Sequence, residues 1–198
     1  MKAIIDSLTK PTLFLDRAAV LARPCPVPAK SGLYAWFFRA IPELVPTDGC
    51  VTKDGLTLLY VGISPRSTDS KENLQKRIRY HYSGNAEGST LRLTLGVLLT
   101  NESECPLRRV GSGKRMTFTH IGEQWLDQWM EENAFVCWVE YERPWEVEHL
   151  VLEELSLPLN IQDNSHHDFS AKLSQLRRQA KQEARETAIA REDNQQRR

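Results

Sequence analysis

Two apolar segments constrain the fold most: residues 31–38 (SGLYAWFF) and residues 58–64 (LLYVGIS). Both have the length and composition of buried strands. In the first, both sets of alternating residues are apolar or aromatic: Leu33, Ala35 and Phe37 point to one face, and Tyr34, Trp36 and Phe38 point to the other. We therefore expect a strand that is covered on both faces. Each segment also carries a tyrosine, Tyr34 or Tyr60, whose hydroxyl needs a polar partner or a cleft.

The rest of the chain predicts a third strand and several helices. The third strand is FVCWVEY at 135–141. A capping box at Asp69 predicts a helix with Leu74, Ile78 and Tyr82 on its apolar face. Further helices are expected over 90–100, over 122–133, from 145 to Pro158, and from Asp168 onward, where the first turns dock and the end frays. Residues 40–56 contain turn signals that suit an elaborated hairpin.

Composition indicates an ordinary globular chain of 198 residues, 40% hydrophobic and 26% charged. No apolar run approaches the ~18 residues of a membrane span. Asp6 and Pro11 interrupt any signal-peptide core near the start, so we expect a cytoplasmic protein. The four cysteines are scattered without CxxC spacing, which predicts reduced thiols rather than a zinc site.

The net charge of zero conceals local basic segments. Residues 170–198 hold eight basic and four acidic side chains, whereas the remainder of the chain is acidic. Residues 101–115 read as a mobile polar loop that ends in RRVGSGKR. Two interpretations of its cations remain open: a solvated loop, or a loop that contacts phosphates of nucleic acid through Arg108, Arg109, Lys114 and Arg115.

Two helical positions are candidates for chemistry. Arg77 and His81 are four residues apart and so share a helix face, at the edge of the buried stripe. Arginine suits a phosphate because it is always charged and donates in a planar fork, although a solvated basic face has the same pattern. Glu148 falls within the apolar arc of its helix, where a carboxylate needs either a divalent metal ion or a salt bridge, for example to Arg77.

Taken in order, five short elements resemble the GIY-YIG nuclease superfamily. They are GLY at 32–34, YVG at 60–62, LQKRIRYH at 74–81, the helical Glu148, and PLN at 158–160. The long insert between the two tyrosines looks more like the restriction-enzyme branch than the compact repair-nuclease branch. The resemblance implies an α+β fold with a small three-stranded, mainly antiparallel sheet flanked by helices, followed by a C-terminal helical tail. We expect a lead-in over 1–30, a catalytic domain over 31–165, and a basic tail over 166–198.

The resemblance also implies a catalytic set and one metal ion. Tyr34 would act as, or assist, the general base, and Tyr60 would polarise the site or the phosphate. Arg77 would stabilise charge on the phosphate. Glu148 would be the sole protein ligand of one Mg²⁺ or Mn²⁺ ion. A free phenol is a weak base, so we expect Arg77, the metal and His81 to lower the pKa of Tyr34.

Two further residues support the site by resemblance, and two positions depart from the family pattern. Gly62 would let the backbone approach the substrate, and Asn160 would bind through its amide. Some relatives have a lysine where Ile63 stands, and we assign its role to His81 as a fifth catalytic residue. Several relatives have a histidine after the arginine helix, where Asn85 or Ser89 would substitute.

The sequence therefore predicts a metal-dependent endonuclease that hydrolyses phosphodiester bonds of nucleic acid, with DNA favoured and no membrane partner. The alternative is a catalytically inactive nucleic-acid-binding or regulatory module on the same scaffold, which the missing lysine and histidine favour. A third hypothesis is a protein-interaction role for the tail. The oligomeric state is left open.

Overall fold

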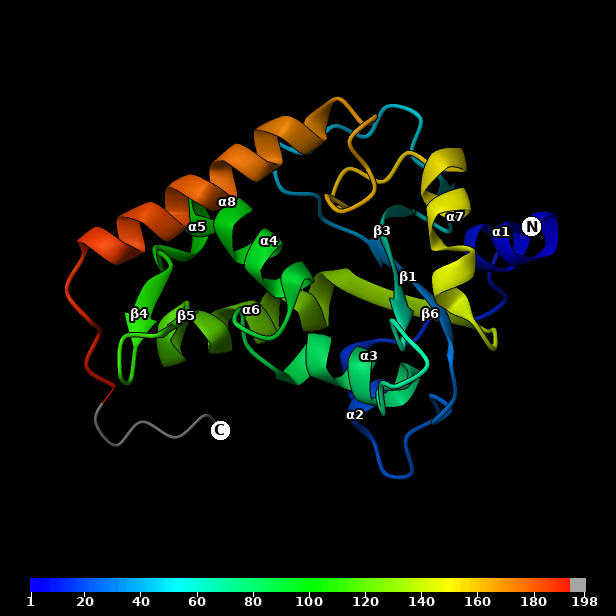
Figure 1. The fold of residues 1–198 in the computed structure, drawn as a ribbon, viewed down its shortest axis with the longest axis horizontal. Coiled ribbons are helices and arrows are strands. Elements are labelled where there is room, and N and C mark those ends of the chain that lie inside the picture. The colour runs from blue at the N-terminus through cyan, green and yellow to red at the C-terminus, as the bar shows by residue number, and fades with distance from the viewer. Residues whose placement is uncertain (193–198) are drawn as a thin grey trace.

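The protein, seen here as a computed structural model that describes residues 1–192, is built around an antiparallel sheet (Figure 1). Strand β1 (Gly32–Phe38) lies in its centre, between β3 (Leu56–Ser64) and β6 (Ala134–Glu140). The expected α+β fold is thus confirmed. A fourth strand that was not expected, β2 (Thr52–Lys53), extends the edge beside β3, and the two are joined by Asp54-Gly55, whose positive φ angles suit a tight hairpin turn.

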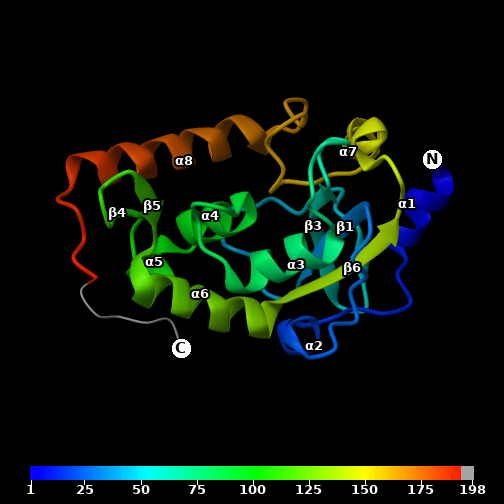
Figure 2. The same ribbon diagram turned by 60° about the horizontal axis from the view of Figure 1, so that its bottom comes forward.

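Both faces of the sheet are covered, as the apolar strands predicted (Figure 2). One core contains Leu33, Ala35 and Phe37 together with side chains of α1 (Lys2–Thr9) and α7 (Glu148–Glu154). The other contains Tyr34, Trp36 and Phe38. It is closed by the remaining long helices, α3 (Leu74–Ser83), α4 (Thr90–Leu98), α6 (Thr119–Asn133) and α8 (Phe169–Glu186), and by the short α2 (Arg17–Leu21).

An irregularity in β3 decides which way Tyr60 faces. The pairing with β1 shifts between Trp36 and Phe37, so that Leu59 is the extra residue of a bulge. Leu58 faces the core that α7 closes, and strict alternation would turn Tyr60 to that same side. Because the bulge changes the phase by one residue, Tyr60 instead shares the face of Tyr34.

Helix α3 begins later than predicted. The capping box at Asp69 is not used: Asn73 is the N-cap, and its side chain accepts a hydrogen bond from the Lys76 amide at 2.9 Å. The amide of Leu74 donates to Lys30 in the lead-in at 2.9 Å. A free N–H at the helix start is thereby paired with a carbonyl far away in sequence, which no local pattern reveals.

Three other segments also differ from expectation. Residues 101–115 are no loop but contain α5 (Thr100–Ser103) and a hairpin of β4 (Arg108–Val110) and β5 (Arg115–Thr117). The helix expected from 145 is a short 3-10 turn (Pro144–Glu146) followed by α7, which ends at Glu154. Helix α8 does not fray after its first turns, since Ala184 is buried and the Ala190 amide donates to Arg109. The last six residues of the tail, 193–198, lie outside the described part.

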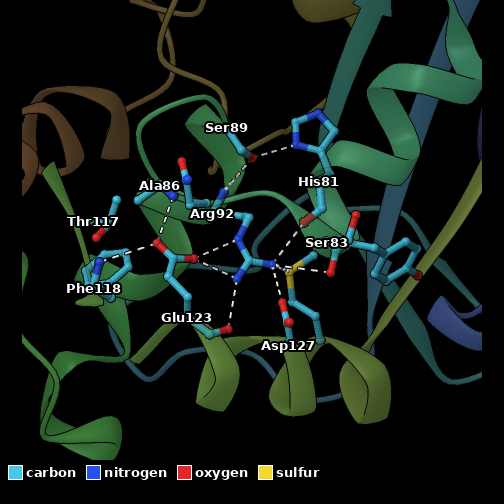
Figure 3. A network of polar contacts seen from close by, with 12 residues as sticks. His81, Ser83, Ala86, Ser89, Arg92, Thr117, Phe118, Glu123 and Asp127 are labelled. Atoms are coloured by element: carbon cyan, nitrogen blue, oxygen red, sulfur yellow. Dashed lines mark hydrogen bonds and ion pairs between the residues drawn. The ribbon is translucent and has the colours of Figure 1, made fainter. Parts of the chain in front are cut away.

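A buried ion network ties α3, α4 and α6 together (Figure 3). The fully buried Arg92 guanidinium donates to Glu123 at 2.7 and 3.0 Å and to Asp127 at 2.8 Å. It also donates to the carbonyls of His81 and Tyr82, at 3.3 and 3.4 Å. An arginine that satisfies two carboxylates and the end of a helix at once fixes how these three helices meet.

None of the helices within residues 1–192 is long and apolar enough to cross a bilayer. The four cysteines are free thiols, as expected. Residues 1–192 contain no group of three or more His, Cys, Asp or Glu side chains placed to hold a metal ion.

We expect Arg92→Met to destabilise the fold by about 3–5 kcal/mol, because it leaves the buried Glu123 without its cation and removes the closer of the two arginines that pair with Asp127. Urea unfolding at neutral pH measures the loss. The control is Arg115→Met, an exposed arginine whose replacement should change the free energy of unfolding by no more than about 0.5 kcal/mol. A loss below about 1 kcal/mol for Arg92→Met would show that the network is not needed for the fold.

Candidate active site

The two motif tyrosines lie together on one face of the sheet. Tyr34 pairs directly with Gly62, and its ring centroid is 6.5 Å from that of Tyr60. A Cβ on Gly62 would come within 2.5 Å of the Tyr34 hydroxyl oxygen. Gly62 was predicted to allow backbone approach to substrate; in the structure the space that it leaves is filled by the Tyr34 ring.

The hydroxyl of Tyr34 begins a buried chain of polar groups. It lies 2.9 Å from Nε2 of His81, and Nδ1 of His81 lies 2.7 Å from the Ser89 hydroxyl. Ser89 is the N-cap of α4 and also accepts a hydrogen bond from the Arg92 amide at 3.1 Å. Of the two residues considered in place of the missing histidine, Ser89 is the one that contacts His81.

Burial sets the protonation of this chain. It raises the pKa of the Tyr34 hydroxyl well above its ordinary value, and Tyr60 adds to the rise, whereas Arg77 and Arg66 oppose it. The expectation of a lowered Tyr34 pKa is therefore wrong for the protein without metal. Burial also lowers the pKa of His81 well below its ordinary value, and the nearby arginines act in the same direction. At neutral pH the pair is a phenol and a neutral imidazole.

Three arginines from separate segments surround the tyrosine pair. Arg77 on α3 acts electrostatically on both phenols, and its guanidinium also donates to the Gly88 carbonyl at 3.0 Å. Arg66, in the loop after β3, acts on Tyr34. Arg177 on α8 lies close enough to Tyr60 for the phenol to affect its pKa. This concentration of positive charge suits an anionic substrate.

Glu148 begins α7 and is half-buried. The salt bridge to Arg77 that was one explanation for it does not form. Burial raises the pKa of its carboxyl; Arg66 opposes the rise and Asp163 adds to it. A half-buried carboxylate without a hydrogen bond or ion pair within residues 1–192 has the oxygen chemistry that a divalent cation requires, so the residues present fit the expected ion.

Asn160 holds the segment after α7 against β3. Its side-chain amide donates to the Val61 carbonyl at 2.7 Å and accepts from the Val61 amide at 3.0 Å. Val61 lies between Tyr60 and Gly62, so this paired contact fixes the strand at the motif. The amide of Asn160 is thus occupied by the protein's own backbone.

The basic segment predicted to contact phosphates is not part of this site. The β4–β5 hairpin lies at the end of the molecule away from α7 (Figures 1 and 2). Arg108 donates to the Ala188 carbonyl at 2.9 Å, and Arg109 donates to Ala184 and Thr187 at 3.1 and 2.9 Å. These two arginines anchor the C-terminal segment. Lys114 and Arg115 are exposed.

Four residues at or beneath the site were not predicted from the sequence: Arg66, Arg92, Asp163 and Arg177. Only Arg92 carried a visible signal, as a charge within the apolar run of TLRLTLGVLLT. An arginine there needs a buried counter-charge. The other three stand in polar segments where their types are ordinary. Only the fold brings Arg66 and Arg177 near the tyrosines and Asp163 near Glu148.

Comparison with protein families gives one match: a model described as the GIY-YIG catalytic domain covers residues 32–179. Neither the curated proteins nor the solved structures contain a significant match to this chain.

We expect Gly62→Ala to destabilise the protein by about 1–3 kcal/mol, because the new methyl group overlaps the Tyr34 ring and must displace it from His81. In a Tyr34→Ala background the same change should cost almost nothing, since the overlapping atoms are gone. Urea unfolding of the four proteins measures this coupling as a double-mutant cycle. Additive losses would show that Gly62 does not make room for Tyr34.

Proposed function

Because the chain belongs to the GIY-YIG nuclease superfamily, we propose that it is a metal-dependent endonuclease that hydrolyses phosphodiester bonds of DNA. The observation that carries the proposal is the 2.9 Å contact between the Tyr34 hydroxyl and His81. A phenol beside a buried neutral imidazole has a proton acceptor at hand, which the phenol alone lacks. We place this activity in the cytoplasm, where free thiols such as its four cysteines persist.

In the proposed reaction the water oxygen bonds to phosphorus as the P–O bond to the leaving oxygen breaks. The leaving oxygen takes a proton from solvent, and His81 receives, through Tyr34, one proton for the one that the water loses. The water gives a proton to the Tyr34 oxygen while Tyr34 passes its own to Nε2 of His81. Nε2 accepts a proton only if Nδ1 carries the hydrogen, and Nδ1–H then donates to the Ser89 hydroxyl oxygen, 2.7 Å away. The chain thereby avoids forming a free phenolate, which the raised Tyr34 pKa disfavours.

Charge neutralisation at the phosphate is the second part of the proposal. A phosphodiester gains negative charge at its oxygens as water attacks, so preorganised cations stabilise the transition state. Arg77 and Arg66 would hold the non-bridging oxygens, with Tyr60 beside them. Glu148 would bind one Mg²⁺ or Mn²⁺ ion, and such an ion, when bound, supplies a Lewis acid for the phosphate or leaving oxygen.

A second candidate is the inactive nucleic-acid-binding module, and one observation favours it. Tyr34 is 1% exposed and Tyr60 is 5% exposed. The two strands were expected to present both hydroxyls to an open cleft, but neither tyrosine lines one. Hydrolysis therefore requires covering side chains to move when substrate arrives, whereas mere binding does not. Salt-sensitive DNA binding without turnover, across metals and substrates, would establish this candidate instead.

We expect Tyr34→Phe to lower the single-turnover rate of plasmid nicking in Mg²⁺ by about 10²–10⁴-fold, since it removes the group that accepts the proton. Glu148→Gln should abolish nicking at Mg²⁺ concentrations that saturate the wild type, because it removes the charged ligand. The screen should also include Mn²⁺ and nicked, branched and single-stranded DNA and RNA.

The matched controls make the same two changes at exposed positions. Tyr80→Phe alters an exposed tyrosine of α3, and Glu153→Gln alters an exposed glutamate of α7. Both should nick as fast as the wild type. Cleavage that persists in folded Glu148→Gln protein, or equal losses in the variants and their controls, would contradict the proposed site.

A further inference from the structure

Helix α8 separates its charges around its circumference. At about 100° per residue, four of its five cations fall within an arc of roughly 100° on one side of the buried face, and the fifth, Lys172, lies on the side of the acids. They are Arg177, Arg178, Lys181 and Arg185, which we name the basic arc. The acids Glu183 and Glu186 lie on the other side of the buried face. A solvated helix that only needs charge for solubility has no reason to gather four cations without an acid between them.

The basic arc is not used to hold the fold together. Within residues 1–192 none of its four members forms a salt bridge or a hydrogen bond. The two acids of the helix bind glutamines instead: Gln179 donates to Glu183 at 2.9 Å, and Gln182 donates to Glu186. The arginines of the hairpin, by contrast, are occupied by carbonyls. Among residues 1–192, the arc is therefore a row of cations that no protein group holds by a hydrogen bond or a salt bridge.

The arc is continuous with the candidate active site. Arg177, which is half-buried, lies within electrostatic range of Tyr60. A groove of about 390 Å³ lies between α8 and the segment after α7, lined by Ile161 on one side and by Arg177, Arg178 and Lys181 on the other. Ile161 directly follows Asn160, which is bound to β3 at the motif. Figure 1 shows α8 running from this region across α4 to the β4–β5 hairpin.

We propose that the basic arc of α8 binds the sugar-phosphate backbone of DNA that extends from the bond to be cleaved. From Arg177 to Arg185 the helix advances roughly 12 Å, at about 1.5 Å per residue. One strand of a B-form duplex carries a phosphate about every 3.4 Å of axis, so this length matches three or four phosphates. The proposal rests on the proposed function for the identity of the ligand. An acidic protein is the competing partner.

Binding without cleavage tests this assignment. Fluorescence anisotropy of a labelled duplex in EDTA, across salt concentrations, compares the wild type with Arg178→Gln/Lys181→Gln/Arg185→Gln. The control Lys2→Gln/Arg23→Gln/Lys172→Gln removes the same charge from exposed positions outside the arc. The α8 variant should bind roughly tenfold more weakly or worse, and its slope of log K against log salt should flatten by about 0.9 per lost phosphate contact. The control should keep the wild-type slope.

Each outcome is decisive. Equal slopes and affinities for the α8 variant and the control would overturn the proposal. Competition by polyglutamate that matches unlabelled DNA at equal charge would also overturn it, and would assign the arc to an acidic protein. If the triple variant does not fold, Arg178→Gln and Arg185→Gln alone, both exposed, carry the test. If the salt slope of the α8 variant flattens but the wild type cleaves nothing in any metal, the proposed hydrolysis fails and the α8 assignment stands. If the wild type cleaves but the slopes of variant and wild type are equal, the α8 assignment fails and the proposed hydrolysis stands.

Discussion

The candidate site depends on the buried ion pairs and hydrogen bonds of the Arg92 guanidinium. Its charge is balanced by Glu123 and Asp127 on α6, and its remaining donors hold the carbonyls that end α3. His81 stands in that last turn, and Ser89 caps the helix that carries Arg92. A buried ion pair is costly to form and more costly to break, so the three helices have one arrangement in which these groups are satisfied. That arrangement brings an imidazole to Tyr34.

The same burial that fixes the geometry also determines the chemistry. Burial favours the neutral imidazole of His81 and the protonated phenol of Tyr34, so both groups are uncharged in the resting protein. Their direct contact supplies a path for one proton without a buried charge in the resting state. The surrounding arginines then favour an anion over any other ligand. The proposed hydrolysis of a phosphodiester would use both features in one place.

Much of the fold could be predicted because strand patterns depend on nearest neighbours. The apolar runs identified the three long strands and the two covered faces of β1. The bulge at Leu59 could not be predicted. When every residue of a strand is apolar, the sequence does not show which residues face which side of the sheet. The start of α3 was misplaced for a related reason: the carbonyl of Lys30, which receives its first amide, belongs to a distant segment.

The motif predicted that Tyr34, Tyr60 and Arg77 lie near one another, and the structure brings these three together. Their catalytic roles, and the metal-binding role of Glu148, stay predictions. Basic residues outside any motif were a poor guide to the site. RRVGSGKR was predicted to contact phosphates, whereas Arg108 and Arg109 donate hydrogen bonds to carbonyls of the C-terminal segment. The arginines that do lie at the tyrosines, Arg66 and Arg177, are more than one hundred residues apart in the chain. Only the packing of α8 across the domain places them around one centre.

The state of His81 tests the central claim most directly, because the proposed proton path requires a neutral, buried imidazole. ¹⁵N NMR of histidine-labelled protein, with His81 assigned by its loss in His81→Gln, reports the protonation of both ring nitrogens. The account predicts a neutral ring with one protonated nitrogen from pH 8 down to about 5.5, below the ordinary pKa near 6.5. A ring that becomes imidazolium near pH 6.5 would contradict it.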